Sequence, residues 1–211
     1  MHTNNNIVRA GLSLEKADKA LIMIHGRGAG AEDILGLAEH LPVKDFALLA
    51  PQATGHSWYP YSFLAKPEQN EPWLGSALDM LATTVDGIVA SGITKERIFF
   101  LGFSQGACLT LEFVTRNATR YGGIAAFTGG LMGDRIYTER YKGDFAGTPV
   151  FIGTGDPDPH VPVQRVHDST ALLQDMHAVV TEKVYPRMGH TINADEIEQA
   201  GRIVFGARPV H

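Results

Sequence analysis

A serine, a histidine and a pair of carboxylates in this sequence could together perform nucleophilic catalysis. Ser104 stands in a Gly-x-Ser-x-Gly pattern at positions 102–106, and Asp156, Asp158 and His190 follow it in that order. A serine hydroxyl is a poor nucleophile at neutral pH, so it needs a general base within hydrogen-bond reach and a group that orients this base. The residue types therefore predict covalent catalysis in which Ser104 is acylated.

The surroundings of Ser104 predict a sharp turn between a strand and a helix. Residues 98–101 form an apolar run typical of a buried strand, and apolar residues recur at helical spacing after position 106. Gly102 and Gly106 are the small neighbours that such a turn needs in order to close. The turn would lift the serine hydroxyl clear of the sheet at a helix N-terminus, which favours developing negative charge. Since the chain has 23 glycines, the bare pattern arises easily by chance, and this placement is what favours a nucleophile.

His190 is the leading candidate for the general base among nine histidines. It follows the last predicted strand, at the loop face where Ser104 is expected to emerge. His160, in the loop that holds the two carboxylates, is the alternative base. His25 is expected to brace a neighbouring glycine-rich loop instead.

Two carboxylates are candidates for the group that orients the base. Asp156 directly follows a predicted strand, and Asp158 lies deeper in the same loop between two prolines. A carboxylate in such a loop also commonly accepts hydrogen bonds from loop N–H groups, and one of the two is expected to have that role. The residues alone leave both assignments open.

A glycine-rich loop at residues 25–30 follows the second predicted strand. It lacks the Gly-Lys-Ser/Thr ending of a P-loop and does not match Gly-x-Gly-x-x-Gly, which argues against nucleotide binding. We interpret it as an oxyanion loop, which donates a backbone N–H group towards the carbonyl that the nucleophile attacks.

An aromatic loop after the third predicted strand is expected to line a substrate pocket. Its aromatic residues include Trp58, Tyr59 and Phe63, and the stretch cannot be a regular helix or strand throughout. Aromatic residues at the carboxyl end of a strand often line a pocket, although they could instead cover the core at the surface. Leu131, in a second glycine-rich loop beside the serine turn, is predicted to contribute to the same pocket.

Strands and helices alternate along the chain. Besides the strand before Ser104, strands are predicted at residues 7–12, 20–24, 46–50, 123–128, 149–154 and 178–185. Helices are predicted at residues 31–38, 72–89, 107–117, 163–176 and 194–205. The first two strands are expected to form a hairpin or meander at one sheet edge. The alternation predicts an α/β fold with a mostly parallel central sheet, helices on both faces and no large lid domain, in one domain of residues 1–211.

Composition restricts the partners and the compartment. Hydrophobic residues make up 44% and charged residues 19%, and the net charge of -5 comes without any basic run, so neither nucleic acid nor an anionic membrane surface is expected as a partner. Residues 1–6 lack a signal-like apolar core and the longest apolar runs are strand-sized, which predicts a cytoplasmic protein without membrane insertion. The lone Cys108 is expected to be a small buried residue. No metal-ligand spacing is present, so no metal or cofactor is expected, and the oligomeric state is left open.

Four motifs, taken in order, resemble the phospholipase/carboxylesterase family of α/β-hydrolases, which includes acyl-protein thioesterases and small bacterial carboxylesterases. They are His-Gly-x-Gly at 25–28, Gly-Phe-Ser-Gln-Gly at 102–106, Gly-Asp-Pro-Asp-Pro-His-Val-Pro at 155–162 and Gly-His at 189–190. The resemblance spans nearly the whole chain and implies the α/β-hydrolase fold. It also implies that Asp158 is the triad acid, that Asp156 is structural, and that the backbone N–H groups of Arg27 and Gln105 form the oxyanion hole.

Arg27 departs from the family pattern, because acyl-protein thioesterases typically carry a leucine at this position. An arginine that points into an apolar acyl tunnel without a partner is strongly unfavourable. We therefore expect its side chain to narrow the acyl pocket or to place positive charge at the rim, unless it turns outward to a surface carboxylate. The departure favours hydrolysis of small carboxylic esters.

Two other functions remain open. A thioesterase or lysophospholipase would share the mechanism but would need a long apolar acyl tunnel. A non-catalytic receptor with the same fold would bind a small molecule, but such receptors often lack a triad member, and all three candidates are present here. A dienelactone hydrolase would carry cysteine at position 104, where this chain has serine.

Overall fold

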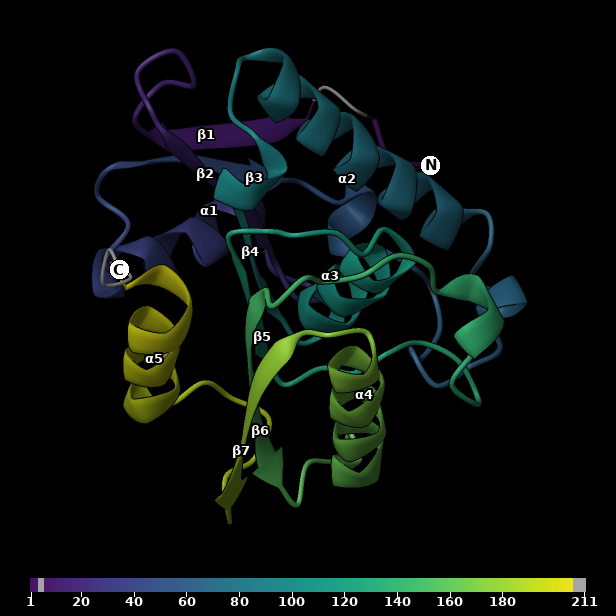
Figure 1. The fold of residues 1–211 in the computed structure, drawn as a ribbon. Coiled ribbons are helices and arrows are strands. Elements are labelled where there is room, and N and C mark those ends of the chain that lie inside the picture. Colours follow the sequence, from purple (N-terminus) through teal and green to yellow (C-terminus); the bar gives the residue numbers. More distant parts are fainter. Residues whose placement is uncertain (4–5, 207–211) are drawn as a thin grey trace.

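A seven-stranded sheet in the order β1-β3-β2-β4-β5-β6-β7 forms the centre of the molecule (Figure 1). The computed structural model describes residues 1–3 and 6–206; residues 4–5 of the opening segment and 207–211 of the predicted domain lie outside the described residues. The strands are β1 (Ile7–Gly11), β2 (Lys19–Ile24), β3 (Phe46–Pro51), β4 (Ile98–Phe103), β5 (Gly123–Phe127), β6 (Pro149–Asp156) and β7 (Val179–Pro186). The α-helices are α1 (Ala31–Leu35), α2 (Trp73–Ala90), α3 (Gln105–Arg116), α4 (Val163–Asp175) and α5 (Ala194–Ala200), and a π-helical turn over Gly201–Phe205 continues the last of them.

The strand β1 pairs with β3, and this pair is the antiparallel one in an otherwise parallel sheet. Val8 lies opposite Ala50, so the predicted hairpin or meander between the first two strands is wrong. The reason lies in burial. β2 is buried along most of its length and takes parallel partners on both sides, whereas half-exposed β1 suits the edge of the sheet.

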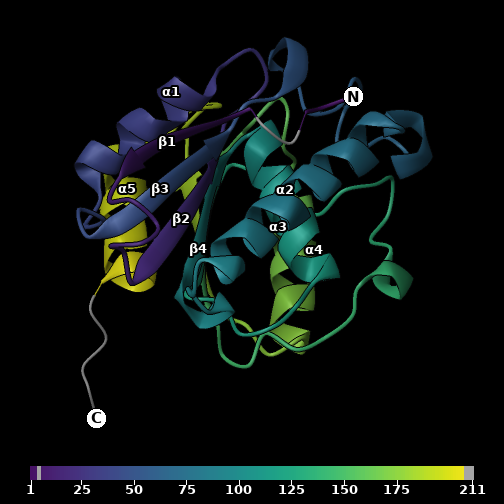
Figure 2. The same cartoon turned by 90° about the horizontal axis from the view of Figure 1, so that it is seen from above.

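Helices cover both faces of the sheet, which confirms the predicted layers. α2, α3 and α4 pack on one face, and α1 and α5 pack on the other (Figure 1 and Figure 2). Side chains alternate between these layers along each strand, so Phe100 of β4 faces the first layer while Phe99 and Leu101 face the second. Burial on both faces explains why the inner strands read as apolar runs.

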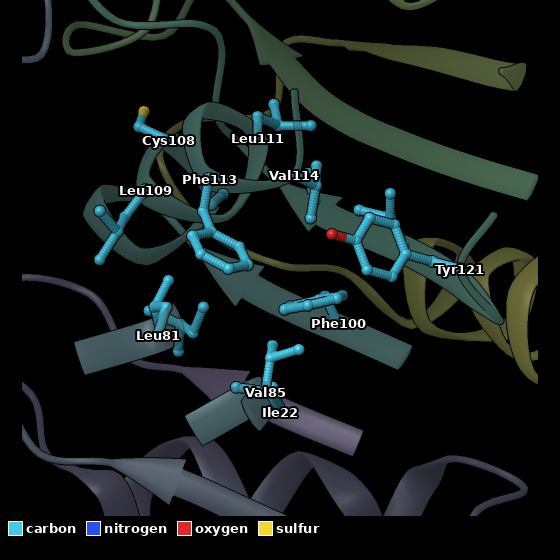
Figure 3. Packing of buried hydrophobic residues seen from close by; sticks show 14 of the residues in the cluster. Ile22, Leu81, Val85, Phe100, Cys108, Leu109, Leu111, Phe113, Val114 and Tyr121 are labelled. Carbon is cyan, nitrogen blue, oxygen red and sulfur yellow. The ribbon is translucent and has the colours of Figure 1, made fainter. Parts of the chain in front are cut away.

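α3 is enclosed by the rest of the molecule along almost its whole length. In the close view of Figure 3, Phe113 on α3 lies near Phe100 on β4, with their ring centroids 5.8 Å apart. Tyr121 packs edge-on against the same Phe100 ring at 5.2 Å. Aromatic pairs of this kind add about 0.5–1.5 kcal/mol each beyond the area that they bury. α3 therefore gives the residue at its N-terminus, Ser104, a firm support.

The carboxyl ends of β4, β5, β6 and β7 lie at one edge of the sheet, because these strands run parallel. The loops that follow them bring residues from distant parts of the chain together, which is where α/β proteins place their sites. Within residues 1–3 and 6–206, no helix combines the length and the apolar character that crossing a bilayer requires.

Candidate active site

Ser104 sits at the sharp turn between β4 and α3. Its backbone φ of 54° and ψ of −118° lie outside the regions that L-residues normally adopt. A Cβ atom on Gly106 would overlap the carbonyl oxygen of Ile24, and one on Gly102 would overlap Gly106, so neither glycine can be replaced without moving the backbone. The turn presents the serine hydroxyl at the start of α3, where the helix dipole favours negative charge.

The Ser104 hydroxyl is within hydrogen-bond distance of His190, which follows β7. Ser104 Oγ and His190 Nε2 are 2.7 Å apart, and His190 Nδ1 is 2.8 Å from Asp158 Oδ2. Because a carboxylate oxygen accepts a hydrogen bond, we assign the imidazole proton to Nδ1, which leaves the Nε2 lone pair facing the serine. This tautomer can accept the serine proton, so the three side chains have the arrangement that general-base catalysis requires.

Asp158 is the carboxylate that contacts the histidine, and its side chain is 0% exposed. Its other oxygen, Oδ1, accepts hydrogen bonds from the backbone N–H groups of His160 at 2.7 Å and Val161 at 2.9 Å. Burial alone would raise the pKa of Asp158, but these two N–H groups and His190 outweigh burial and lower the pKa below its ordinary value. Asp156, at the end of β6, is exposed.

His160, the alternative base, and His25, predicted to brace the glycine-rich loop, both lie outside the contact with Ser104. The exposed His160 ring packs edge-on against His190, with their centroids 4.8 Å apart. His25 is fully buried; its Nδ1 donates to the Gly26 carbonyl at 2.7 Å and its Nε2 accepts from the Ala53 N–H at 3.1 Å. Burial lowers the pKa of His25, which keeps this ring neutral and able to brace the glycine-rich loop. In the part of the chain that the structure describes, no three His, Cys, Asp or Glu side chains are grouped to hold a metal ion.

Two backbone N–H groups beside Ser104 are available to a substrate oxygen. Among residues 1–3 and 6–206, neither the Arg27 N–H nor the Gln105 N–H has a hydrogen-bond partner. Gln105 is the first residue of α3, where N–H groups lack partners within the helix. Gly26, which precedes Arg27, lies against Ser104 and Phe103. The two N–H groups are therefore candidates for an oxyanion hole.

A cavity of about 450 Å³ opens beside the serine hydroxyl. Aromatic, polar and cationic side chains line it, together with one proline, one valine and one cysteine: Arg27, Tyr59, Pro60, Tyr61, Ser62, Phe63, Ser104, Gln105, Cys108, His160, Val161 and His190. All four predicted pocket residues are buried in the core, and of these Tyr59 and Phe63 also line the cavity, whereas Trp58 and Leu131 do not. The Trp58 indole N–H donates to the carbonyl of His25 at 2.9 Å, and the Leu131 backbone N–H donates to Ser169 Oγ at 2.9 Å.

The Gln105 side chain organises the wall of the cavity, a role that the sequence does not indicate. Its Oε1 accepts from the Trp58 N–H and its Nε2 donates to the Tyr59 carbonyl, both at 2.9 Å. Asn70 holds the next part of the aromatic loop, with Oδ1 accepting from the Tyr61 N–H at 2.8 Å. The Gln105 contacts reach backbone atoms 46 and 47 positions away and the Asn70 contact spans nine positions, and no periodicity or motif carries a signal for them.

The Arg27 side chain also lines the cavity. Its guanidinium donates hydrogen bonds to three successive carbonyl oxygens of the aromatic loop: Tyr59 at 2.8 Å, Pro60 at 2.9 Å and Tyr61 at 2.9 Å. Within the described residues it forms no ion pair, so the outward turn to a surface carboxylate is not what the structure shows. One residue thus joins the glycine-rich loop to the aromatic loop.

The loop that carries His190 is held by the start of α5. Asn193 and Glu196 form a capping box, in which each side chain accepts the other's backbone N–H at 2.9 Å. Glu196 is buried against β6, where a Cβ on Gly153 would overlap its carboxyl group. Among the described residues its Oε1 has no hydrogen-bond partner. Burial raises the pKa of Glu196 to about 7.

We expect the protein to lose stability as Glu196 ionises. The folded state holds this proton more tightly than the unfolded chain, whose pKa is 4.5, so stability decreases between about pH 4.5 and pH 7. The raised pKa corresponds to about 3 kcal/mol of lost stability at pH 8. In urea unfolding from pH 5 to pH 8, Glu196→Gln should therefore gain most of this amount relative to the wild type. The exposed Glu198→Gln controls for the lost charge, and an advantage of Glu196→Gln that does not grow with pH would contradict the prediction.

Comparisons with known proteins place the chain among hydrolases. The profile of the Phospholipase/Carboxylesterase family matches residues 5–204. A crystal structure of a phospholipase/carboxylesterase from Dyadobacter fermentans is 52% identical, with a TM-score of 0.95 and coverage of 97% of this chain and 98% of that chain. The crystal structure of the Bacillus cereus carboxylesterase, at 21% identity and a TM-score of 0.73, covers 93% of this chain and 91% of that chain and shares the fold.

Curated relatives are more distant in sequence. Acyl-protein thioesterase 1 of Saccharomyces cerevisiae is 27% identical over 94% of this chain and 97% of that protein. Acyl-protein thioesterase 1 of Gibberella zeae is 34% identical, but this match spans 53% of the chain and about half, 48%, of that protein. The family match over nearly the whole described chain, together with the similarity to the Dyadobacter structure, shows that the chain is a hydrolase that belongs to the phospholipase/carboxylesterase family of α/β-hydrolases.

Proposed function

We propose that this hydrolase is a serine carboxylesterase that hydrolyses small carboxylic esters through an acyl-enzyme intermediate. One observation carries the proposal: hydrogen bonds of 2.7 and 2.8 Å connect Ser104 to His190 and His190 to Asp158 beside an open cavity. A nucleophile, a base and an orienting carboxylate in this arrangement are what acyl transfer requires.

Acylation begins when Ser104 Oγ attacks the carbonyl carbon of the ester and His190 Nε2 takes the hydroxyl proton. Asp158 stabilises the imidazolium that forms, and the backbone N–H groups of Arg27 and Gln105 bind the negatively charged carbonyl oxygen. The C–O bond to the alcohol then breaks, and the alcohol leaves with the proton from His190. Water repeats the sequence on the acyl-enzyme, gives a proton to His190, and releases the carboxylic acid as Ser104 regains its hydroxyl proton.

The cavity favours a small substrate. Its volume of about 450 Å³ lies in the lower part of the range of small-molecule sites, and a guanidinium and hydroxyl groups contribute to its walls. Cys108 also lines it, but burial raises the pKa of this thiol to about 12, so the thiol stays protonated at neutral pH and does not compete as a nucleophile. Ser104 is therefore the proposed site of acylation.

Thioester hydrolysis is the second candidate, because the relatives in Saccharomyces cerevisiae and Gibberella zeae are named acyl-protein thioesterases. A thioester would follow the same steps with a thiol as the leaving group. The two functions differ in the acyl chain that the cavity must hold, since lipid-length chains need a long apolar tunnel.

A panel of p-nitrophenyl esters and matched thioesters, from acetyl to dodecanoyl, tests the proposal. We expect kcat/KM to be highest for the shortest oxygen esters and to fall with chain length, because a chain that outgrows the cavity must remain in water. Rates that rise with acyl length, and more steeply for thioesters, would favour the second candidate. No turnover of any member of the panel would contradict both.

A further inference from the structure

We propose that the physiological ester carries a carboxylate group and that the Arg27 guanidinium binds it. This inference rests on the proposed esterase function and names a substrate class for the same site. The charge of the cavity wall supports it. Among the described residues that line it, Arg27 is the one whose side chain is always charged, the two imidazoles can only add positive charge, and none is an Asp or Glu.

No carboxylate in the described part of the chain neutralises the guanidinium. Its three partners are the uncharged carbonyl oxygens of Tyr59, Pro60 and Tyr61, and it has no ion pair among residues 1–3 and 6–206. Asp158, the carboxylate that contacts His190, has a fully buried side chain, and its oxygens accept hydrogen bonds from His190 and from two backbone N–H groups. An anion that enters the cavity therefore meets Arg27 at a wall to which, among the described residues, no carboxylate side chain contributes.

The guanidinium keeps unused donors. An arginine has five N–H groups, and three of them are engaged here, two from Nη2 and one from Nη1. One N–H on Nη1 and the N–H on Nε therefore remain for a ligand, with no acceptor among the described residues. A long apolar acyl chain laid over these groups would remove their water without replacing it, whereas a carboxylate oxygen would replace it with a charge-assisted hydrogen bond.

The position of Arg27 is set before any substrate arrives. Its backbone belongs to the loop next to Ser104, and its side chain is tied to the aromatic loop at three points, so little side-chain freedom is left to lose on binding. Arg27 is exposed, and solvent and salt weaken a charge pair at such a position. We therefore expect a carboxylate to improve kcat/KM by about tenfold at low salt, the size of one modest charge-assisted hydrogen bond.

Two matched substrate pairs test the inference. Ethyl hydrogen succinate and ethyl levulinate differ in whether the acyl part ends in a carboxylate or in a methyl ketone of similar size. Acetoxyacetate and acetoxyacetone make the same comparison on the alcohol part, so the pairs show which side of the ester carries the anion. Rates are measured with a pH-stat at pH 7.5, and within each pair the kcat/KM of the carboxylate ester is divided by that of the ketone ester. For the wild type this ratio should be about ten in at least one pair, and added salt should reduce it.

Variants of Arg27 separate charge from loop support. Arg27→Met removes both the charge and the hydrogen bonds that support the loop. Arg27→Lys keeps a cation, but an ammonium group cannot donate to the three carbonyl oxygens in the same way. Loosening of the aromatic loop lowers the rates of both members of a pair, so the ratio within each pair reports the charge alone. The ratio should fall to about one in Arg27→Met and stay above one in Arg27→Lys.

Three results would overturn the inference. They are a wild-type ratio of one or less in both pairs, a ratio that persists in Arg27→Met, and a ratio that does not respond to salt. If the wild type hydrolyses ethyl levulinate or acetoxyacetone and Ser104→Ala does not, the esterase function stands even when the carboxylate preference fails. If none of the four esters is hydrolysed, and the p-nitrophenyl panel also fails, the proposed function and this inference are overturned together.

Discussion

Replacing Ser104 with alanine should lower kcat for p-nitrophenyl acetate by about 10⁶, as loss of the nucleophile does in serine proteases with the same triad. The hydroxyl is the group proposed to form the covalent bond, so no neighbouring side chain can substitute for it. His190→Ala should lower kcat by a similar factor, and the double variant by little more, because the residues act as a unit. The oxyanion N–H groups and the cavity should leave a residual rate about 10³-fold above the uncatalysed reaction.

A fluorophosphonate probe provides an independent measurement. Mass spectrometry of the labelled wild type should locate the phosphonyl group on Ser104, and Ser104→Ala should remain unlabelled. Ser13→Ala, at an exposed position away from the cavity, controls for the mere loss of a hydroxyl. Labelling of another serine, or undiminished turnover by Ser104→Ala, would overturn the assignment of the nucleophile.

The turn that presents Ser104 could be predicted because its constraints are local. The apolar strand, the two small residues and the following helical spacing lie within a few positions of the serine, and backbone sterics dictate what each must be. The order of the later elements was predictable for a similar reason, since alternating strands and helices allow few ways to build a parallel sheet.

The partner of β1 was not predictable from the turn that follows it. A short connection to β2 favours a hairpin, but β2 is buried on both faces and is paired on both edges by β3 and β4. β1 is left to the free edge of β3. Whether β1 pairs with β2 or with β3 is decided by how the whole sheet is buried, and residue patterns near the turn do not indicate this.

The arrangement of side chains in the cavity wall was the part of the site least predictable from the sequence. In a loop without a regular period, the presence of an aromatic residue does not say whether its ring faces the substrate. The backbone N–H of Trp58 donates to Gln105 and its indole N–H donates to His25, and these bonds hold the residue in the interior. The contacts of Gln105 and Arg27 with loop carbonyls depend on the course of the backbone rather than on residue type. Sequence reasoning could place Arg27 beside the nucleophile, but whether it turned inward or outward required the structure.

The choice between the two carboxylates gives the second large expected effect. Asp158→Asn should lower kcat by about 10⁴, the loss seen when the triad aspartate of a serine protease becomes asparagine. The new amide would still accept the N–H groups of His160 and Val161 through its oxygen, so its nitrogen would face His190 Nδ1. An N–H group there favours the tautomer with the proton on Nε2, and the histidine can then no longer accept the Ser104 proton.

Asp156→Asn is the matched control, because it makes the same chemical change two residues away at an exposed position. It should leave kcat for p-nitrophenyl acetate within a few-fold of the wild type, since the hydrogen bonds of the described residues connect Ser104, His190 and Asp158 without Asp156. Urea midpoints of both variants separate a catalytic loss from unfolding, and Asp158→Asn should remain folded while it loses turnover. If Asp156→Asn is the inactive variant and Asp158→Asn keeps its rate, the orienting carboxylate is Asp156, and the contact of Asp158 with His190 serves only to support the loop.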